Sequence, residues 1–214
     1  MKIKVNSVRM VQTEKNPSLR GFASVTIDDL FTVKDVSILE GKNEMFSSMP
    51  SYKGKDGEFH SFIGFKEGST VQKEINKAIV DAYSKVRDGK EFEKTEIDNK
   101  TAVEGSKLVK VYAKENGFVN LSYNDVYING SRIVQGNQGL FMSMPKGTPF
   151  QKDDQTIYPD RIYIPNQEAR NIIQEKAVKN YEITVSQSKA TQEFEGSLDA
   201  LTQDEETDEE EDER

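Results

Sequence analysis

The sequence predicts an α+β protein built from two similar domains, and three observations support this prediction. First, residues 25–50 (VTIDDLFTVKDVSILEGKNEMFSSMP) resemble residues 121–145 (LSYNDVYINGSRIVQGNQGLFMSMP). Second, each half begins with short segments in which apolar and polar residues alternate, as they do in half-buried β-strands. Third, each half ends in a stretch whose apolar residues recur at helical spacing. The repeat period of roughly 95 residues is too long for a solenoid unit and suits a small domain.

The matches between the two halves fall at positions with specific chemistry. With one single-residue gap, the aligned pairs are Phe22 with Phe118, Asp29 with Asp125, Gly41 with Gly136, Phe46 with Phe141, and Met49-Pro50 with Met144-Pro145. We therefore expect the halves to fold alike and to pack as a pseudo-dimer, in which one chain supplies both members of a twofold pair.

The strands of the two halves are expected in the same order. Residues 2–11 and 108–113 open each half, and in the first half the alternating segment 22–27 follows. Asx pairs at 28–29 and 124–125 predict turns, because these side chains hydrogen-bond their own backbone. Strands at 31–39 and 126–134 then reach a glycine, which permits a tight turn. The next strands, 45–49 and 140–144, end at proline, which offers no N–H to a neighbouring strand.

One helix closes each half. In the first half, Ser69 and Gln72 have the spacing of a capping box, and apolar residues recur from residue 71 to residue 86. Lys73, Lys77, Asp81 and Lys85 fall on the opposite face. In the second half, Asn166 is the expected N-cap of a helix that turns Ala169, Ile172, Ile173, Ala177 and Tyr181 inward. Each half is then a small antiparallel sheet with a C-terminal helix.

These elements divide the chain into a first domain (1–86), a linker (87–107), a second, diverged domain (108–185) and a tail (186–214). The linker is charged and almost free of large apolar residues. The net charge of −8 belongs to the whole chain and does not describe residues 1–192, which we call the body, because residues 193–214 hold 12 acidic residues and one basic residue. The remainder has 28 basic and 25 acidic residues, a net charge of +3. Residues 204–213 include nine acidic residues and no apolar one, so we expect a disordered tail.

The composition disfavours several functions. The chain has no cysteine, which removes disulfides and thiolate sites and suits a reducing cytoplasm. No stretch has the apolar length of a membrane span or a signal peptide. The single histidine, His60, has no partner that the sequence identifies, and the Asp pairs at 28–29 and 153–154 lack metal-site spacing. We expect a cytoplasmic protein that is not an enzyme and needs no cofactor or metal.

The first half contains three motifs in order: ASVTID at 23–28, the spaced run from Phe31 to Ser51, and DGEF at 56–59. Their order resembles the stage V sporulation protein G (septation protein) family. The second half matches less closely and lacks both the serine after its proline and the DGEF run. The resemblance implies a protein that pairs as a dimer through its sheets, binds DNA and RNA, and regulates gene expression. It also implies binding through the basic residues after Met-Pro-Ser and through part of the helix.

The loops after the two Met-Pro pairs interleave lysine with aromatic residues. Lysine neutralises phosphates without reading sequence, and exposed aromatic rings stack on unpaired bases. Phe59, Phe62 and Tyr163 are expected in the core. The candidate nucleic-acid-binding residues are Tyr52, Lys53, Lys55, Lys73, Lys77, Lys146, Phe150 and Lys152. The lysine face of the first helix is equally consistent with a solvated surface.

The favoured function is single-stranded DNA binding in replication or recombination. The alternatives are a transcriptional or post-transcriptional regulator of duplex DNA or RNA, and a scaffold that binds only proteins. The tail either competes for the basic body or recruits protein partners. Its candidate residues are Phe194, Leu198, Leu201, Asp204, Glu205, Glu206, Asp208, Glu209, Glu210, Glu211, Asp212 and Glu213. We expect a monomeric pseudo-dimer or a homo-oligomer.

Overall fold

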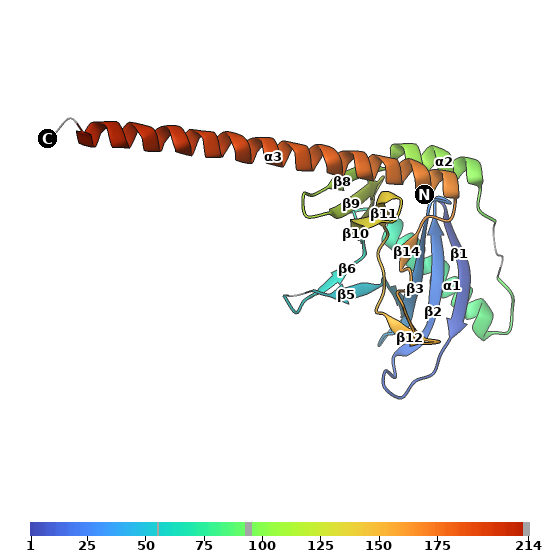
Figure 1. The fold of residues 1–214 in the computed structure, drawn as a ribbon. Coiled ribbons are helices and arrows are strands. Elements are labelled where there is room, and N and C mark those ends of the chain that lie inside the picture. Colours follow the sequence, from blue (N-terminus) through green and yellow to red (C-terminus); the bar gives the residue numbers. More distant parts are fainter. Residues whose placement is uncertain (55, 93–95, 212–214) are drawn as a thin grey trace.

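The computed structural model describes residues 1–54, 56–92 and 96–211, with side chains through residue 195 apart from the same gaps. Over these residues it is an α+β protein with antiparallel sheets and three helices (Figure 1). Two five-stranded sheets form the frame, and two short hairpins project from it. This architecture confirms the α+β class that the residue patterns predict.

Both halves contain the same sequence of elements. The first half has β1 (Ile3–Met10), β2 (Leu19–Ile27), β3 (Phe31–Glu40), β4 (Met45–Ser48), β5 (Ser51–Lys53), β6 (Phe59–Ser61), β7 (Ile63–Phe65) and α1 (Val71–Arg87). Helix α2 (Asn99–Leu108) follows. The second half has β8 (Lys110–Ala113), β9 (Phe118–Tyr123), β10 (Val126–Gly136), β11 (Gly139–Ser143), β12 (Phe150–Lys152), β13 (Gln155–Ile157), β14 (Ile162–Tyr163) and α3 (Gln167–Glu211). Seven strands and one helix therefore recur in one order.

The two halves exchange their last strand. The first sheet has the order β1-β2-β3 with β4 beside β3, and the second has β8-β9-β10 with β11 beside β10. Strand β14 of the second half pairs with β3, with Ile162 opposite Val33. Strand β7 of the first half pairs with β10, with Ile63 opposite Ile128. Separating the halves would therefore break backbone hydrogen bonds in both sheets.

The same β-bulge occurs in β3 and in β10. The pairing of β3 with β2 gains one residue within 33–36, and the pairing of β10 with β9 gains one within 128–131. Each bulge contains one residue with a positive φ, Asp35 at 55° and Gly130 at 86°. Aspartate and glycine are two of the residue types that tolerate this left-handed conformation. The bulges thus match in position as well as in kind.

One hydrophobic cluster spans both halves. Helix α1 packs across β1, β2 and β4, and α3 packs across β8, β10 and β11. The helical face predicted for α1 is buried, and Lys73, Lys77 and Lys85 are exposed on the other side. Asn166 caps α3 as predicted, since its Oδ1 accepts from the backbone N of Ala169 at 2.8 Å. The capping box is wrong, because Thr70, not Ser69, is the N-cap of α1.

The predicted linker is partly helical. Asp98 caps α2, because its Oδ1 accepts from the backbone N atoms of Lys100 and Thr101 at 3.0 and 3.3 Å. The hydrogen bond from the Thr101 hydroxyl, and then those from the two backbone N–H groups, hold the pKa of the Asp98 carboxyl below its usual value. The buried residues of α2 include Ala102 and Gly105. A search for large apolar residues misses such a helix, since small residues let it pack closely against α3.

The segment before α2 covers a buried ion pair. Lys4 on β1 pairs with Asp29 in the β2–β3 turn, and both side chains are almost fully buried. The ammonium of Lys4 also donates to the backbone oxygen of Glu96. A buried charge needs such partners, because it has lost its hydration.

The predicted disordered tail is wrong for the backbone up to Glu211, because α3 runs without a break from Gln167 to that residue. Extending an existing helix avoids the cost of nucleation, and glutamate favours helical backbone. Figure 1 shows α3 leaving the body beyond β8 and β9. Asp212 and Glu213 lie outside the described residues. Over the described ranges, no helix combines the length and apolar character needed to cross a membrane.

Candidate nucleic-acid interface

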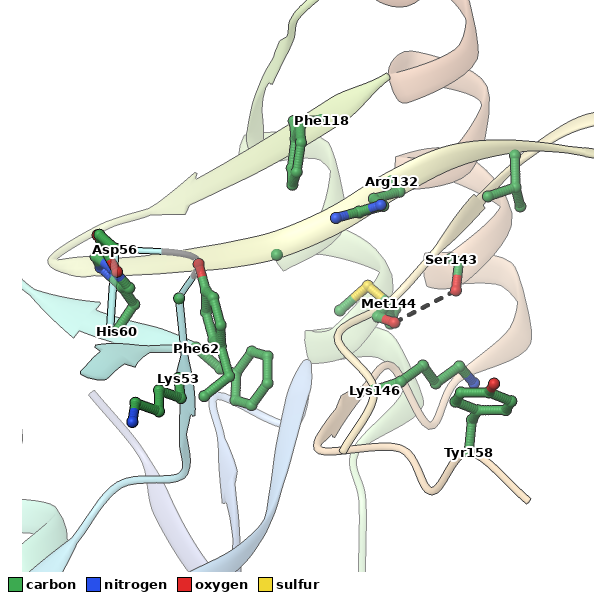
Figure 2. A pocket seen from close by; sticks show the side chains of 14 residues that line it. Lys53, Asp56, His60, Phe62, Phe118, Arg132, Ser143, Met144, Lys146 and Tyr158 are labelled. Atoms are coloured by element: carbon green, nitrogen blue, oxygen red, sulfur yellow. Dashed lines mark hydrogen bonds and ion pairs between the residues drawn. The ribbon is translucent and has the colours of Figure 1, made fainter. Parts of the chain in front are cut away.

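A groove of about 860 Å³ lies between the β5–β6 hairpin of the first half and the strands of the second sheet (Figure 2). The hairpin side includes Tyr52, Lys53 and His60. Strands β9 and β10 contribute Phe118 and Arg132. The segment after Pro145 contributes Lys146 and Tyr158, which are labelled in Figure 2. Both halves of the chain therefore build this one groove.

The aromatic rings on the hairpin side form a short stack. The ring centroid of Tyr52 is 4.9 Å from that of Phe62 and 5.5 Å from that of His60. Phe62 is buried, whereas Tyr52 is 39% exposed. The buried ring holds the exposed one in place, so a ligand that stacks on Tyr52 meets a preorganised surface.

Three cationic side chains, Lys53, Arg132 and Lys146, line the groove. The guanidinium of Arg132 lies 4.2 Å from the ring centre of Phe118, and a stacked guanidinium keeps its N–H donors in its own plane. Lys146 pairs with Asp160. Within the described residues, neither Lys53 nor Arg132 has an ion-pair partner. Both of these charges are therefore available to a phosphate.

His60 has a partner that sequence reasoning missed. Its Nε2 lies 2.8 Å from Oδ2 of Asp56, four residues earlier in the β5–β6 loop. The backbone N–H of Glu58, and then His60, hold the pKa of the Asp56 carboxyl below its usual value. Gly54 packs against both side chains, since an added Cβ would meet Oδ1 of Asp56 and the His60 ring. Both side chains are exposed, so a larger residue at 54 would displace the pair from this geometry.

The structure brings some of the predicted binding residues together and separates others. Tyr52, Lys53 and Lys146 line the groove. Phe150 and Lys152 are exposed on β12, and Lys73 and Lys77 are exposed on α1; none of these four lines the groove. Lys55 lies outside the described residues.

The core predictions for three aromatic residues have different outcomes. Phe62 is buried as expected, but Phe59 is 73% exposed on β6, so that prediction is wrong. The strand β6 pairs only with β5, and this hairpin stands away from the sheets. Tyr163 is half-buried, with Nζ of Lys34 4.6 Å from its ring centre.

Sequence reasoning also missed the strand residues of the groove. Phe118 and Arg132 face each other across β9 and β10. Residues in direct register lie on the same face of a sheet. The alternating pattern of β9 indicates which of its residues share a face. It does not show that Arg132 lies beside Phe118, because that depends on the register between β9 and β10. Loop composition points to Tyr52 and Lys146, whereas the strand residues need the pairing.

The related position in the first half is built differently. The backbone N of Lys34 donates to the oxygen of Arg161 at 2.8 Å, just as that of Asn129 donates to Phe62 at 2.9 Å. Arg161 and Phe62 therefore occupy matching places beside the two bulges. The hollow beside Arg161 has a volume of about 320 Å³, and Lys34, Asp35 and Tyr163 contribute to its lining. It is thus much smaller than the groove.

Comparison with known proteins identifies relatives of this chain. The family model described as SpoVG matches residues 1–85. A protein of Clostridium perfringens (strain 13 / Type A) that carries the name septation protein SpoVG is 35% identical over 83 residues, which is 39% of this chain and 91% of the relative. The protein of the same name from Brevibacillus brevis is 36% identical over 93 residues, 44% of this chain and 95% of the relative. The one from Bacillus licheniformis is 33% identical over 95 residues, 44% of this chain and 97% of the relative.

Proposed function

The chain belongs to the SpoVG family, and from this premise we propose that it is a nucleic-acid-binding protein whose groove holds single-stranded DNA. One observation carries the proposal: the groove combines exposed aromatic rings with cations. Lys53 and Arg132 supply positive charge for phosphates, and Lys146, which pairs with Asp160, adds a third cation to the groove. Tyr52 and Phe118 supply rings for bases. The proposed role is binding alone, without catalysis, in the cytoplasm, and in replication or recombination.

The preference for a single strand follows from what the rings can reach. In a duplex the faces of the bases are stacked on one another, so an aromatic side chain gains little from them. An unpaired base offers its face, and such stacking is worth roughly 1–3 kcal/mol per base. A groove with aromatic walls is therefore expected to bind unpaired strands more tightly than duplex.

The second candidate function is regulation through duplex DNA or RNA, and the exposed face of α1 favours it. Lys73 and Lys77 lie on that face, away from the groove lining. Lysines on a helix surface bind phosphates of any strand. In this alternative, α1 carries the affinity and the groove carries none.

We further propose that residues 1–86 and 108–185 are diverged copies of one domain that pack as a pseudo-dimer, joined by a linker and followed by a partner-binding tail. The common element order, the reciprocal exchange of β7 and β14, and the matching bulges support this origin. The tail proposal is supported by the exposed end of α3, on which Phe194 is 66% exposed. Residues beyond it contribute the acidic run that would steer a partner.

The experiment that tests the binding proposal is a salt titration with fluorescently labelled single-stranded DNA, duplex DNA and RNA of one sequence. Single-stranded DNA is expected to bind tightest, with affinity falling steeply as salt rises. Equal or tighter duplex binding that is lost in a Lys73→Ala/Lys77→Ala variant would favour the α1 alternative. No binding to any of the three would leave only the scaffold function.

A further inference from the structure

The second sheet has one covered face and one free face. Helix α3 packs on β8, β10 and β11, and Val111, Leu121 and Met142 are buried. The strand register places other residues on the opposite face. Tyr112 on β8 lies opposite Asn120 on β9, and Ser122 on β9 lies opposite Tyr127 on β10. We name these four residues, Tyr112, Asn120, Ser122 and Tyr127, the tyrosine face.

The two rings of the tyrosine face are accessible. Tyr112 is 57% exposed and Tyr127 is 40% exposed. Gly64 on β7 lies opposite Tyr127 and adds no side chain that could cover the ring. A hollow of about 370 Å³ lies among these residues. Tyr112 lies on the edge strand β8 and Tyr127 on the inner strand β10, and two exposed rings that line one hollow mark an interaction site.

The tyrosine face continues the groove. Phe118, which lines the groove, precedes Asn120 and Ser122 on β9 at alternate positions, so all three side chains lie on one face. From Phe118 to Ser122 the strand rises by about 13 Å. A ligand that leaves the groove past Phe118 therefore reaches the tyrosine face without turning a corner.

The charged residues around the tyrosine face indicate which class of ligand it suits. Of the described residues that the register places on it, Lys110 and Arg132 are cationic and none is acidic. A face with cations, aromatic rings and small neutral polar groups suits a polyanion that carries planar bases. Asn120 and Ser122 can hydrogen-bond base edges between the rings.

The fold itself does not require tyrosine at these positions. In the first sheet, Thr26 and Thr32 occupy the places of Ser122 and Tyr127. Each pair is the second from the turn that joins its two strands. Both threonines are fully buried, and their hydroxyl oxygens lie 2.7 Å apart. The related sheet therefore closes this region with small polar residues. The open aromatic pair is a property of the second sheet.

We propose that the tyrosine face is a second stacking platform for the same single strand, so that the strand runs from the groove past Phe118 to Tyr127 and Tyr112. The inference rests on the proposed function of the groove. It adds that affinity grows with strand length until the bases reach both tyrosines, and that this gain is absent for duplex DNA.

The test is a series of oligothymidylates of increasing length, titrated by fluorescence anisotropy against the full chain and a Tyr112→Val/Tyr127→Val variant. Valine suits a strand, and circular dichroism and thermal unfolding serve as fold controls. The variant is expected to bind the shortest oligonucleotides as the wild type does. With oligonucleotides long enough to reach both tyrosines, the affinity of the variant is expected to be lower than that of the wild type by about tenfold or more for each ring removed.

The controls separate the two proposals. A Lys53→Ala/Lys146→Ala variant should weaken all lengths. If the lysine variant weakens binding at all lengths while the valine variant binds every length like the wild type, the proposal for the tyrosine face is overturned and the proposal for the groove stands. If the wild type binds no oligonucleotide, both fail. If sedimentation shows a dimer that the valine variant abolishes with no change in DNA affinity, the face joins two copies of the chain, and the inference is overturned.

Discussion

Arg161, just before β14 of the second half, forms an ion pair with Asp35 in the β3 bulge of the first half. At the matching place in the second sheet, Phe62 lies over Gly130, where an added Cβ would come within 3.3 Å of the ring. The β3 bulge is therefore contacted by the ion pair of Arg161 with Asp35, and the β10 bulge is contacted by the Phe62 ring, which packs on Gly130. The ring of Phe62 and Gly130 both line the large groove.

The buried pair of Lys4 and Asp29 gives a prediction for stability. Lys4→Met leaves a buried carboxylate without its main partner, which costs about 3–5 kcal/mol of unfolding free energy. Urea unfolding followed by circular dichroism measures the loss. Lys2 is the matched control, because its Nζ lies 3.6 Å from the same carboxylate but its side chain is 54% exposed. Lys2→Met should cost less than about 1 kcal/mol. Equal effects from the two variants would contradict the role of the buried pair.

The groove cations give a prediction for salt dependence. Lys53→Ala and Lys146→Ala, separately and together, should lower the affinity for single-stranded DNA. Each lost phosphate contact should also flatten the slope of log K against log salt by about 0.7. Binding titrations over a range of salt concentrations measure both quantities. Lys73→Ala/Lys77→Ala on α1 is the control. If only the control variant changes the slope, the strand binds on the helix instead.

Tyr123 gives a prediction for alkaline pH. Burial, and then the nearby Asp28 carboxylate, raise its pKa from 10.0 to about 12. Between these values the unfolded chain loses the phenolic proton while the folded chain keeps it. The stability that this group contributes is thus complete below pH 10 and is lost as the pH rises through about 12.

Absorbance titration should therefore show one of the eight tyrosines ionising late. Tyr123→Phe keeps the edge-to-face contact with Phe31, whose ring centroid is 6.1 Å away, and should remove the late step. Asp28→Asn should move that step to lower pH. An unchanged late step in Tyr123→Phe would assign it to another tyrosine.

The tail gives a prediction that combines fold and binding. Contacts of α3 with the body include those from Lys176 and Asn180 to backbone oxygens near β8 and reach Thr184, whose Oγ lies 3.4 Å from the oxygen of Ala113. Deletion of residues 193–214 removes none of these contacts, so the thermal unfolding midpoint should stay the same. If the acidic run competes for the groove, deletion should tighten DNA binding, most at low salt. Unchanged affinity at every salt concentration would exclude self-competition and leave partner binding or plain solubility as the role of the tail.

Much of the element order could be predicted, because the repeat and the period-2 alternation are local signals. The exchange of β7 and β14 could not, since strands of two or three residues take their partners from tertiary contacts. Helix α2 was missed because its buried face consists of small residues such as Ala102 and Gly105. In the groove, Tyr52 and Lys53 follow from loop composition. Arg132 does not, because its place depends on the β9–β10 register.

The exchanged strands have a consequence for the order of events during synthesis. The first sheet receives its β14 strand only after Ile162 has been made, long after Val33, its partner, has left the ribosome. Pairings so distant in sequence slow folding, because a long loop must close before they form. Strand β4 pairs with residues 37–40 of β3, so the first half waits with the beginning of this edge, at Thr32 and Val33, unpaired until the second half arrives. An open strand edge attracts other chains, so nascent copies on neighbouring ribosomes are exposed to mispairing at this edge.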